Sequence, residues 1–296
     1  MLVALLAGSL IGLGSVRRPY GEVASNETLL PSRPETKAMR SRLRIATFNI
    51  HSGRGVDGEE NLGRTAAVMR GFDLIGLNEV RGPDWLRRTS QAEELGAQLG
   101  MASIFGPSER RWYITSFGNG LLSRFPILSW RSRPMRVNGK TSYRAVILAR
   151  LALGDRSVNV VVAHVERGEA RDAQLSELRD LLAHTPAPAL LLGDFNRGLH
   201  HAELRRMAEL PGVTYAVPTQ PGSRPRHADH IYAKGFVVDG GGIVPTDASD
   251  HPVVWTELED PVLADRESGQ NSSAQGNANK EPIRHRQIPC TDCKRE

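Results

Sequence analysis

The stretch from residue 189 to residue 196 reads Ala-Leu-Leu-Leu-Gly-Asp-Phe-Asn, an apolar run that ends in a carboxylate and an amide. Four consecutive apolar residues before a glycine predict a short buried strand. Asp194 and Asn196 then lie at the end of that strand, where loops on a rigid scaffold often carry function. Taken alone, an Asp or Asn after a strand is more often a turn former or a helix cap. The rest of the chain has to decide between these interpretations.

The same arrangement, a polar side chain next to an apolar strand, recurs along the chain. Strands are predicted at residues 43–50, 73–80, 102–106, 118–122, 142–153, 157–165, 189–192, 230–233 and 252–258. Helices are predicted at residues 61–70, 92–99 and 172–183, where apolar residues recur at helical spacing. The further polar residues at strand ends are Asn49, Glu79, His164, Asp229, Asp250 and His251.

Strands outnumber helices in this pattern, and several neighbouring strands have no helix between them. A doubly wound parallel sheet would alternate strands with helices. We therefore expect an α/β fold in which mixed sheets form a sandwich with helices outside.

The two ends of the chain differ from its middle. Residues 1–18 are an apolar segment closed by two arginines, which predicts an export signal or a membrane anchor and favours a membrane-anchored or exported protein over a cytoplasmic one. The apolar run is nevertheless short of the roughly twenty residues that a membrane span needs, and no basic stretch precedes it. The proline-containing segment 19–41 predicts a linker, and residues 42–259 predict one globular domain.

Residues 260–296 are rich in polar and charged residues and predict a disordered tail. The only cysteines of the chain, Cys290 and Cys293, lie in this tail. No disulfide framework can therefore support the core, and two thiols fall short of the four ligands of a structural zinc site.

Seven short stretches of the globular domain contain the strand-end residues. They are Thr47-Phe48-Asn49-Ile50, Leu77-Asn78-Glu79-Val80, Gly118-Asn119-Gly120-Leu121-Leu122-Ser123-Arg124, Ala163-His164-Val165, Leu192-Gly193-Asp194-Phe195-Asn196, Ala228-Asp229-His230-Ile231 and Ser249-Asp250-His251-Pro252. In this order they resemble the endonuclease/exonuclease/phosphatase superfamily, which includes pancreatic-type deoxyribonucleases, abasic-site endonucleases, sphingomyelinases and inositol-phosphate phosphatases. The resemblance implies a four-layered α/β/β/α sandwich of two mixed β-sheets flanked by helices, with a catalytic site at one edge of the sheets.

The resemblance also implies a divalent metal ion. A hard cation such as Mg²⁺ takes oxygen ligands, and Mn²⁺ is expected to substitute for it. In the family pattern Glu79 is the principal metal ligand, and Asn49 and Asp250 bind the ion directly or through water. Some members have an acidic residue where this chain has His51. The number of metal ions therefore stays open.

The remaining strand-end residues correspond to the family's catalytic groups. Asp194 is expected to orient or deprotonate the attacking water, and Asn196 to hold that water and a phosphate oxygen. His164 is expected to donate to a non-bridging oxygen. His251, oriented by Asp229, forms an acid/base pair. The sequence leaves open whether Asp194 or His251 takes the proton.

Arg144 aligns with an arginine that some members of the family use to bind the phosphate. The chain carries a formal net charge of +5, which favours contact with phosphates, nucleic acid or an anionic lipid surface.

The substrate is less well defined than the reaction. Arginines stand beside aromatic residues in the stretches 81–88 and 108–113, and further arginines occur at 220–227. This mixture suits nucleic-acid bases and phosphates, so DNA is slightly favoured. The same mixture suits a membrane surface, so a phospholipid or sphingomyelin headgroup is an alternative, as is a small-molecule phosphatase activity.

The least favoured interpretation is a non-catalytic binding protein on the same fold. Such a protein has no need to keep every polar residue of the site. All of the strand-end positions hold the residue types that catalysis requires, which argues for an enzyme. The oligomeric state is not indicated by the sequence.

Overall fold

The computed structural model describes residues 17–33, 41–111, 115–137, 139–218 and 227–265. Within these ranges two seven-stranded mixed sheets face each other. One sheet contains, in spatial order, β1 (Arg18–Pro19), β5 (Ala102–Arg111), β6 (Thr115–Ser123), β4 (Leu74–Arg81), β3 (Arg42–Asn49), β14 (Val253–Glu259) and β13 (Val237–Val244). The other contains β11 (Val213–Tyr215), β12 (Asp229–Lys234), β10 (Ala189–Asp194), β9 (Arg156–His164), β8 (Lys140–Leu153), β7 (Ile127–Val137) and β2 (Val23–Ser25).

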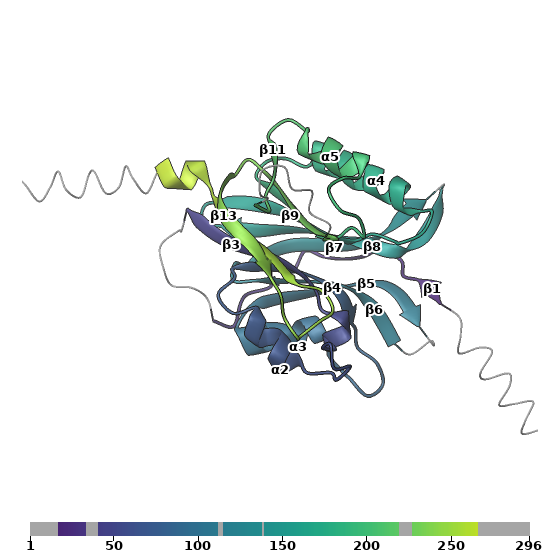
Figure 1. The fold of residues 1–296 in the computed structure, drawn as a ribbon. Helices are drawn as coiled ribbons and strands as arrows, with labels where there is room; N and C mark the ends of the chain where they lie inside the picture. The colour runs from purple at the N-terminus through teal and green to yellow at the C-terminus, as the bar shows by residue number, and fades with distance from the viewer. Residues whose placement is uncertain (1–16, 34–40, 112–114, 138, 219–226, 266–296) are drawn as a thin grey trace, which may run out of the picture.

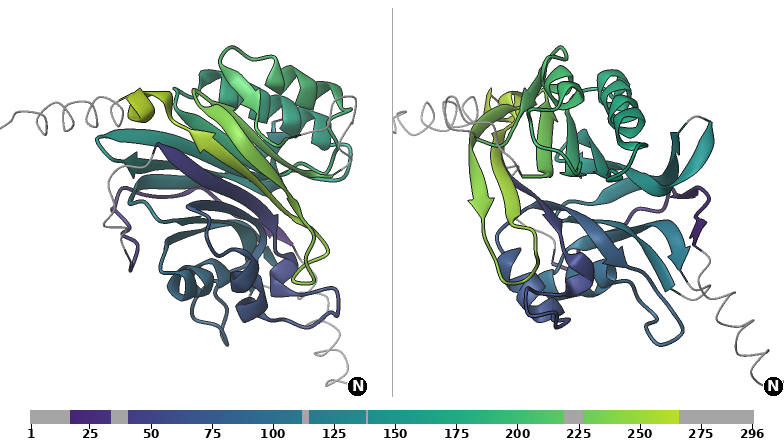
Figure 2. Two further views of the ribbon diagram at one scale, coloured as in Figure 1. Left: turned by 60° about the vertical axis from the view of Figure 1, so that its left-hand side comes forward. Right: turned by 45° about the vertical axis from the view of Figure 1, so that its right-hand side comes forward.

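Helices cover the outer face of each sheet (Figure 1). On the first sheet these are α2 (Leu62–Val68) and α3 (Gln91–Leu99), with the short 3₁₀ turn η1 (His51–Gly53) between β3 and α2. On the second sheet they are α4 (Arg171–His184) and α5 (Ala202–Ala208). The two further views in Figure 2 show the same four layers from other sides. The expected α/β/β/α sandwich is confirmed.

Strand periodicity explains why this arrangement has three apolar cores. Successive side chains of a strand point to opposite faces, so a strand covered on both sides must be apolar throughout. In β10, Leu190 and Leu192 belong to the core between the sheets, whereas Leu191 packs under the helices. In β3, Ile45 lies between the sheets and Phe48 faces α2 and α3. The continuous run at 189–192 is therefore the sequence of a strand with no solvent-exposed face.

Two parallel strand pairs bring the polar strand ends to one edge of the sandwich. Strand β3 runs parallel to β4, and β9 runs parallel to β10 with His164 opposite Asp194. Strand β12 is antiparallel to β10, which sets Asp229 at its first position opposite Asp194. Carboxyl ends of parallel strands meet at the same edge, and ligands bind there in open α/β sheets.

The predicted elements are found, and some of the strands are longer than expected, but several elements were missed. The strands β7, β11 and β13 and the helix α5 were not predicted. Strand β13 contains three consecutive glycines and is partly exposed along its length, so it has neither the composition nor the alternation of a typical strand. Its pairing with β14 supplies the order that its own residues do not favour.

The segment predicted as a linker is part of the sandwich where the structure describes it. Strand β1 pairs with β5 at the edge of one sheet, and β2 pairs with β7 at the edge of the other. Beyond β2, Leu29 forms an isolated antiparallel β-bridge with Ile127, the first residue of β7. Edge strands with unpaired backbone groups accept such additions readily. The linker prediction for residues 19–33 is therefore wrong, and residues 34–40 lie outside the described residues.

The folded body also extends slightly past residue 259. Asp260 is buried and accepts hydrogen bonds from Arg156 Nη1 at 2.6 and 2.8 Å. Leu263 belongs to the core between the sheets. The tail was therefore predicted to begin a few residues too early. Residues 1–16 and 266–296, including the two cysteines, lie outside the described residues, and the described part of the chain contains no helix of the length and apolarity that a membrane crossing requires.

Candidate functional site

The site lies where β3, β4, β9 and β10 end and where β12 and β14 begin. A buried asparagine pair holds the two sheets together beneath it. Asn78 Nδ2 donates to Asn119 Oδ1 at 2.9 Å and to the carbonyl oxygen of Ala163 at 3.0 Å. Asn78 Oδ1 accepts from the backbone N–H of Asp194 at 2.8 Å, and Asn119 Nδ2 donates to the carbonyl oxygen of Ala145 at 2.8 Å. These bonds connect β4 and β6 of one sheet with β8, β9 and β10 of the other.

The sequence analysis assigned no role to these two asparagines, although both stand inside the quoted motifs. The signal was present, because an asparagine within an apolar strand needs buried partners. Partners so far apart in the chain cannot be identified from the pattern alone.

Backbone strain is concentrated at this site. In the described residues, positive φ outside glycine occurs at His51, Ser52, Glu79 and Asn196. Glu79 has φ of 57° at a register shift in the pairing of β4 with β6, and the shift turns its side chain into the site. Such backbone conformations cost about 1–3 kcal/mol each and cluster at functional sites.

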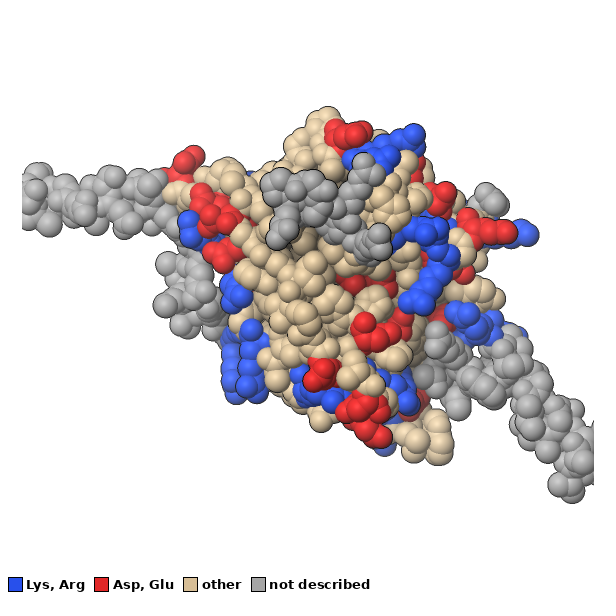
Figure 3. All heavy atoms as spheres, in the orientation of Figure 1, with Lys and Arg blue, Asp and Glu red and all other residues tan. Residues whose placement is uncertain are grey.

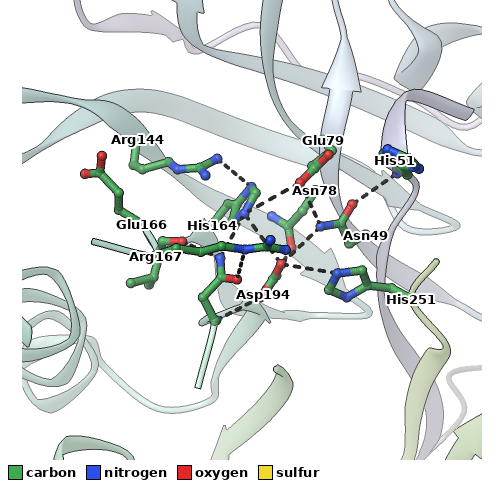
Figure 4. Close-up of polar contacts among 12 residues, drawn as sticks. Asn49, His51, Asn78, Glu79, Arg144, His164, Glu166, Arg167, Asp194 and His251 are labelled. Carbon is green, nitrogen blue, oxygen red and sulfur yellow. Dashed lines mark hydrogen bonds and ion pairs between the residues drawn. The ribbon is translucent and has the colours of Figure 1, made fainter. Parts of the chain in front are cut away.

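One carboxylate oxygen is the centre of the polar network (Figure 4). Asp194 Oδ2 accepts from Asn49 Nδ2 at 3.0 Å, and it lies 3.5 Å from His164 Nε2 and 3.8 Å from His251 Nε2. Asn49 Nδ2 also donates to Glu79 Oε1 at 3.2 Å, so one amide group bridges two carboxylates. Burial raises the pKa of Asp194, and the charge of His251 and the donated hydrogen bonds offset part of that rise.

The tautomer of His164 follows from its neighbour on β8. Arg144 Nη1 lies 2.8 Å from His164 Nδ1, and a guanidinium can only donate. His164 Nδ1 is therefore the acceptor, and in the neutral ring Nε2 carries the proton. That N–H points toward Asp194 Oδ2 and Glu79 Oε1, the latter at 4.0 Å. Burial lowers the pKa of Arg144, and the negative charge of Glu79 partly restores it.

Asn196 and Arg167 complete this side of the site. Asn196 Nδ2 donates to the carbonyl oxygen of Val165 at 2.7 Å and lies 3.3 Å from His164 Nε2. Arg167 Nε donates to Asn196 Oδ1 at 2.8 Å. The amide of Asn196 is therefore held from both ends.

His251 and Asp229 form the expected pair. His251 Nδ1 lies 2.7 Å from Asp229 Oδ2, which leaves Nε2 facing Asp194. Burial would lower the pKa of His251, but the hydrogen bond and charge of Asp229 outweigh it and raise that pKa to about 9. Burial raises the pKa of Asp229, and its hydrogen bond to His251 lowers it in part. With a pKa above neutrality the ring of His251 keeps a proton on each nitrogen, Nδ1–H toward Asp229 and Nε2–H toward Asp194.

Asp250 is the predicted residue that stands apart. Its side chain is 55% exposed, and Asp250 Oδ1 lies 3.6 Å from His51 Nδ1. Within the described residues no hydrogen bond or ion pair joins it to Glu79. The other predicted residues form one connected network, whose members are Asn49, Glu79, Arg144, His164, Asp194, Asn196, Asp229 and His251.

Two groups of side chains could hold a metal ion. Ligand atoms of Asp194, Asp229 and His251 lie within 4.8 Å of one another. Asp229 Oδ2 and His251 Nδ1, however, already bond to each other, although Asp229 Oδ1 is buried without a partner among the described residues. Glu79 and Asp194, with the amide of Asn49 between them, offer oxygen atoms and are not ion-paired to any lysine or arginine of the described chain. This second group fits a hard divalent cation better.

Comparisons with known proteins agree with the geometry. A family model described as Endonuclease/Exonuclease/phosphatase family matches residues 46–251. The chain is similar to the protein named Uncharacterized protein YbhP from Escherichia coli strain K12, with 29% identity over 174 residues. That match covers 52% of this chain and 66% of the relative, so this chain spans just under two thirds of the relative's length.

Solved structures show the same fold. The endonuclease/exonuclease/phosphatase from Beutenbergia cavernae DSM 12333 has a TM-score of 0.60 and 24% identity, over 74% of this chain and 72% of that one. The human Nocturnin catalytic domain with bound sulfate has a TM-score of 0.57 and 16% identity, over 80% and 97%. D. rerio TDP2 complexed with single strand DNA product has a TM-score of 0.53 and 19% identity, over 74% and 100%.

Proposed function

The chain belongs to the endonuclease/exonuclease/phosphatase family, and from this membership we propose that it is a divalent-metal-dependent hydrolase that cleaves a phosphoester bond by attack of water on phosphorus. The observation that carries the proposal is the position of Asp194 Oδ2. This atom lies within 4 Å of nitrogen donors from Asn49, His164 and His251, which come from three separate parts of the chain. A buried carboxylate with this surrounding suits the handling of a water proton.

Glu79 would be the principal ligand of a divalent ion, and Asn49 and Asp250 would hold it directly or through water, with the carboxylate of Asp194 close by. Two carboxylates share the amide nitrogen of Asn49, and a cation compensates their negative charge. When bound, Mg²⁺, or Mn²⁺ in its place, supplies neutralisation of the phosphate charge and a Lewis acid.

The residues of the chain then divide the remaining work. Asp194 orients the attacking water and accepts its proton. His164 donates from Nε2 to a non-bridging oxygen, and Arg144 supports it through Nδ1 and adds positive charge. Asn196 holds the water or a phosphate oxygen with its amide.

On the opposite side His251, held by Asp229, presents an N–H at Nε2 to the charge that develops on the phosphate or on the leaving group. Asp194 is favoured over His251 as the proton acceptor because a pKa of about 9 leaves Nε2 of His251 protonated at neutral pH, so that it donates and does not accept.

The proposed substrate is a phosphodiester, with nucleic acid slightly favoured. The net charge of +5 supports an anionic polymer. Among proteins of this fold, D. rerio TDP2 has been solved with a single strand DNA product and human Nocturnin with a sulfate anion. Both ligands belong to those proteins, and they support the class of substrate here only through the shared fold.

A lipid phosphodiester is the second candidate, and one observation favours it. Trp85 and Leu86, on the loop after β4, are 74% and 77% exposed. Asp84 Oδ1 accepts from the backbone N–H groups of Leu86 and Arg87, so the two apolar side chains stand at the tip of a defined turn. Exposed apolar pairs of this kind suit the surface of a bilayer. A membrane-anchored or exported location through residues 1–18 would agree with such a substrate.

Hydrolysis of bis(p-nitrophenyl) phosphate tests the reaction itself. We expect activity with Mg²⁺ or Mn²⁺, loss of activity in EDTA and recovery when metal is restored. Glu79→Gln and Asp194→Asn are expected to lower kcat by about 10²–10⁴-fold. Asp180→Asn removes a carboxylate from the exposed face of α4 and should retain the wild-type rate. Undiminished activity of Asp194→Asn would reject the proposed role of that carboxylate.

A parallel panel tests the substrate class. Plasmid DNA, abasic-site duplex, sphingomyelin vesicles and inositol phosphates are incubated with wild type and with His251→Ala. Cleavage of DNA without release of a lipid headgroup is expected. Headgroup release that is lost in Trp85→Ala, with DNA left intact, would reverse the ranking.

A further inference from the structure

Three arginines border the side of the site formed by His164 and Asn196, and the proposed hydrolysis does not use them. Arg167 lies on the loop after β9, Arg171 begins α4, and Arg197 follows Asn196 directly. Figure 3 shows one face of the molecule, with acidic side chains near its middle and basic side chains to either side of them. The two loops that carry the arginines follow the neighbouring parallel strands β9 and β10.

Arg167 is directed toward the catalytic residues. Its Nε donates to Asn196 Oδ1 at 2.8 Å, and in Figure 4 its guanidinium extends toward Asp194. The residue is otherwise exposed. A charge of this kind beside the reacting phosphate can contact a neighbouring anionic group of the same substrate.

Arg171 is the least solvated of the three, with 8% of its surface exposed. Within the described residues its side chain bonds only to the carbonyl oxygen of Glu166, at 3.2 Å from Nε. It also occupies the first position of a helix, where the helix dipole disfavours a positive charge. Burial and the charges of Arg197 and Arg167 lower the pKa of Arg171, with Asp172 as a partial offset.

Three carboxylates lie next to this cluster along the chain, at Glu166, Glu169 and Asp172. Asp172 is directed elsewhere, with its Oδ1 3.2 Å from His201 Nε2. Arg197 has an exposed side chain, but its backbone is fixed because its carbonyl oxygen lies 2.5 Å from the buried His230 Nε2. In the described part of the chain no carboxylate is hydrogen-bonded or ion-paired to any of the three guanidinium groups. Like charges held close together without a counterion destabilise a fold unless a ligand supplies the counterion.

We propose that Arg167, Arg171 and Arg197 form a second phosphate subsite, so that the preferred substrate carries a further phosphate next to the scissile one. The inference rests on the proposed phosphoesterase function and narrows its substrate class. Guanidinium groups match phosphate through paired N–H donors, and three of them exceed what a single scissile phosphate, already served by Arg144 and His164, requires. The further phosphate is either the next one in a nucleic-acid backbone or a terminal phosphomonoester.

Two chromogenic substrates that differ by one phosphate test the subsite. Thymidine 5′-(p-nitrophenyl phosphate) is compared with the same compound bearing a 3′-phosphate. For wild type we expect KM to be about 10-fold lower with the additional phosphate, which corresponds to one good charge-assisted contact. Arg171→Gln and Arg197→Gln should each remove most of this difference, with the effect in KM and not in kcat. Arg131→Gln, an exposed arginine on β7, is the matched control and should keep the full ratio.

Arg197→Gln keeps the test valid where Arg171→Gln fails to fold, because Arg197 is exposed. Oligonucleotides then separate the two sources of the phosphate. A KM that falls from dinucleotide to trinucleotide assigns the subsite to a backbone phosphate, whereas a gain only with a terminal phosphate assigns it to a phosphomonoester. An equal KM for both chromogenic substrates in wild type overturns the subsite and leaves the hydrolase function standing.

Binding measured without turnover keeps the two proposals apart. Isothermal titration with thymidine 3′,5′-bisphosphate and thymidine 5′-monophosphate, with Ca²⁺ as the cation, is expected to give about 10-fold tighter binding of the bisphosphate. If neither chromogenic substrate is hydrolysed but the bisphosphate preference is present and is lost in Arg197→Gln, the hydrolase function fails and the anion site stands. If the two ligands bind equally, the subsite is refuted.

Discussion

The side chain of Asn78 is expected to couple the stability of the sandwich to its catalytic geometry. It is fully buried, and it is bonded to Asn119 Oδ1, to the carbonyl oxygen of Ala163 and to the backbone N–H of Asp194. Asn78→Ala removes all three bonds and leaves each partner without this contact. The partners belong to both sheets, so the substitution acts on the interface between them.

The expected loss of stability follows from the buried polar groups that Asn78→Ala leaves without a partner. A buried polar group that loses its partner costs about 1–3 kcal/mol, and these costs are only partly additive for neighbours. We expect Asn78→Ala to lower the free energy of unfolding by about 3–5 kcal/mol, a large part of the stability of a domain. Because Asp194 loses one of the bonds that position its backbone, kcat should fall by about 10–100-fold in the fraction that stays folded.

Urea unfolding monitored by tryptophan fluorescence measures the first quantity, and single-turnover kinetics on folded protein measure the second. Asn159→Ala is the matched control, because Asn159 is a half-buried residue of β9 whose Nδ2 donates to the carbonyl oxygen of Pro186 in a bond that is open to solvent. Asn159→Ala should lower the free energy of unfolding by less than about 1 kcal/mol. The combined Asn78→Ala and Asn119→Ala variant should cost less than the sum of the two changes. If Asn78→Ala and Asn159→Ala lower the free energy of unfolding by the same small amount, the proposed role of Asn78 in joining the two sheets is refuted.

Further outcomes follow from individual residues. Gly193 has φ of +146°, and a Cβ there would lie 1.8 Å from the carbonyl oxygen of Ala163. Gly193→Ala should therefore lower the melting temperature by well over 5 °C in differential scanning fluorimetry. An unchanged melting temperature would contradict the close approach. Burial lowers the pKa of His230 to about 3, so the unfolded chain takes up this proton first as pH falls. The stability that the neutral ring contributes is complete above about pH 6.5 and is lost by up to about 1.4 kcal/mol per pH unit below it. His230→Gln should remove this part of the slope in urea unfolding between pH 7 and pH 4, and a slope equal to that of wild type would exclude the assignment. Asp229→Asn should lower the pKa of His251 from about 9 by more than one unit, because the carboxylate charge that raises it is gone. NMR titration of the imidazole measures this change. An unchanged pKa would show that Asp229 does not set the protonation of His251.

The sequence alone determined the strands that are buried on both faces and the residues at their ends. A run such as 189–192 has no solvated face, and its apolar side chains alone predict that property. Polar residues after such runs emerge at a sheet edge, and the resemblance to the family predicted that Asn49, His164 and Asp194 share one site there. The order of the motifs then indicated the family and its fold.

Only the tertiary structure revealed the elements that have no local signal. Strand β13, with its glycines, and the edge strands β1 and β2 take their order from the strands that they join. That no bond joins Asp250 to Glu79 among the described residues also appeared only in the structure, where β3 lies between β4, which carries Glu79, and β14, which follows Asp250.

Sequence patterns record which chemistry each residue carries and which face of its own element it occupies. They do not record which distant residue will be its partner. The backbone N–H of Asp194 and the side chain of Asn78 are 116 positions apart, and the bond between them depends on how two sheets pack and in which register their strands pair. That register is fixed by the summed packing of both sheets, a quantity that no single stretch of the chain contains.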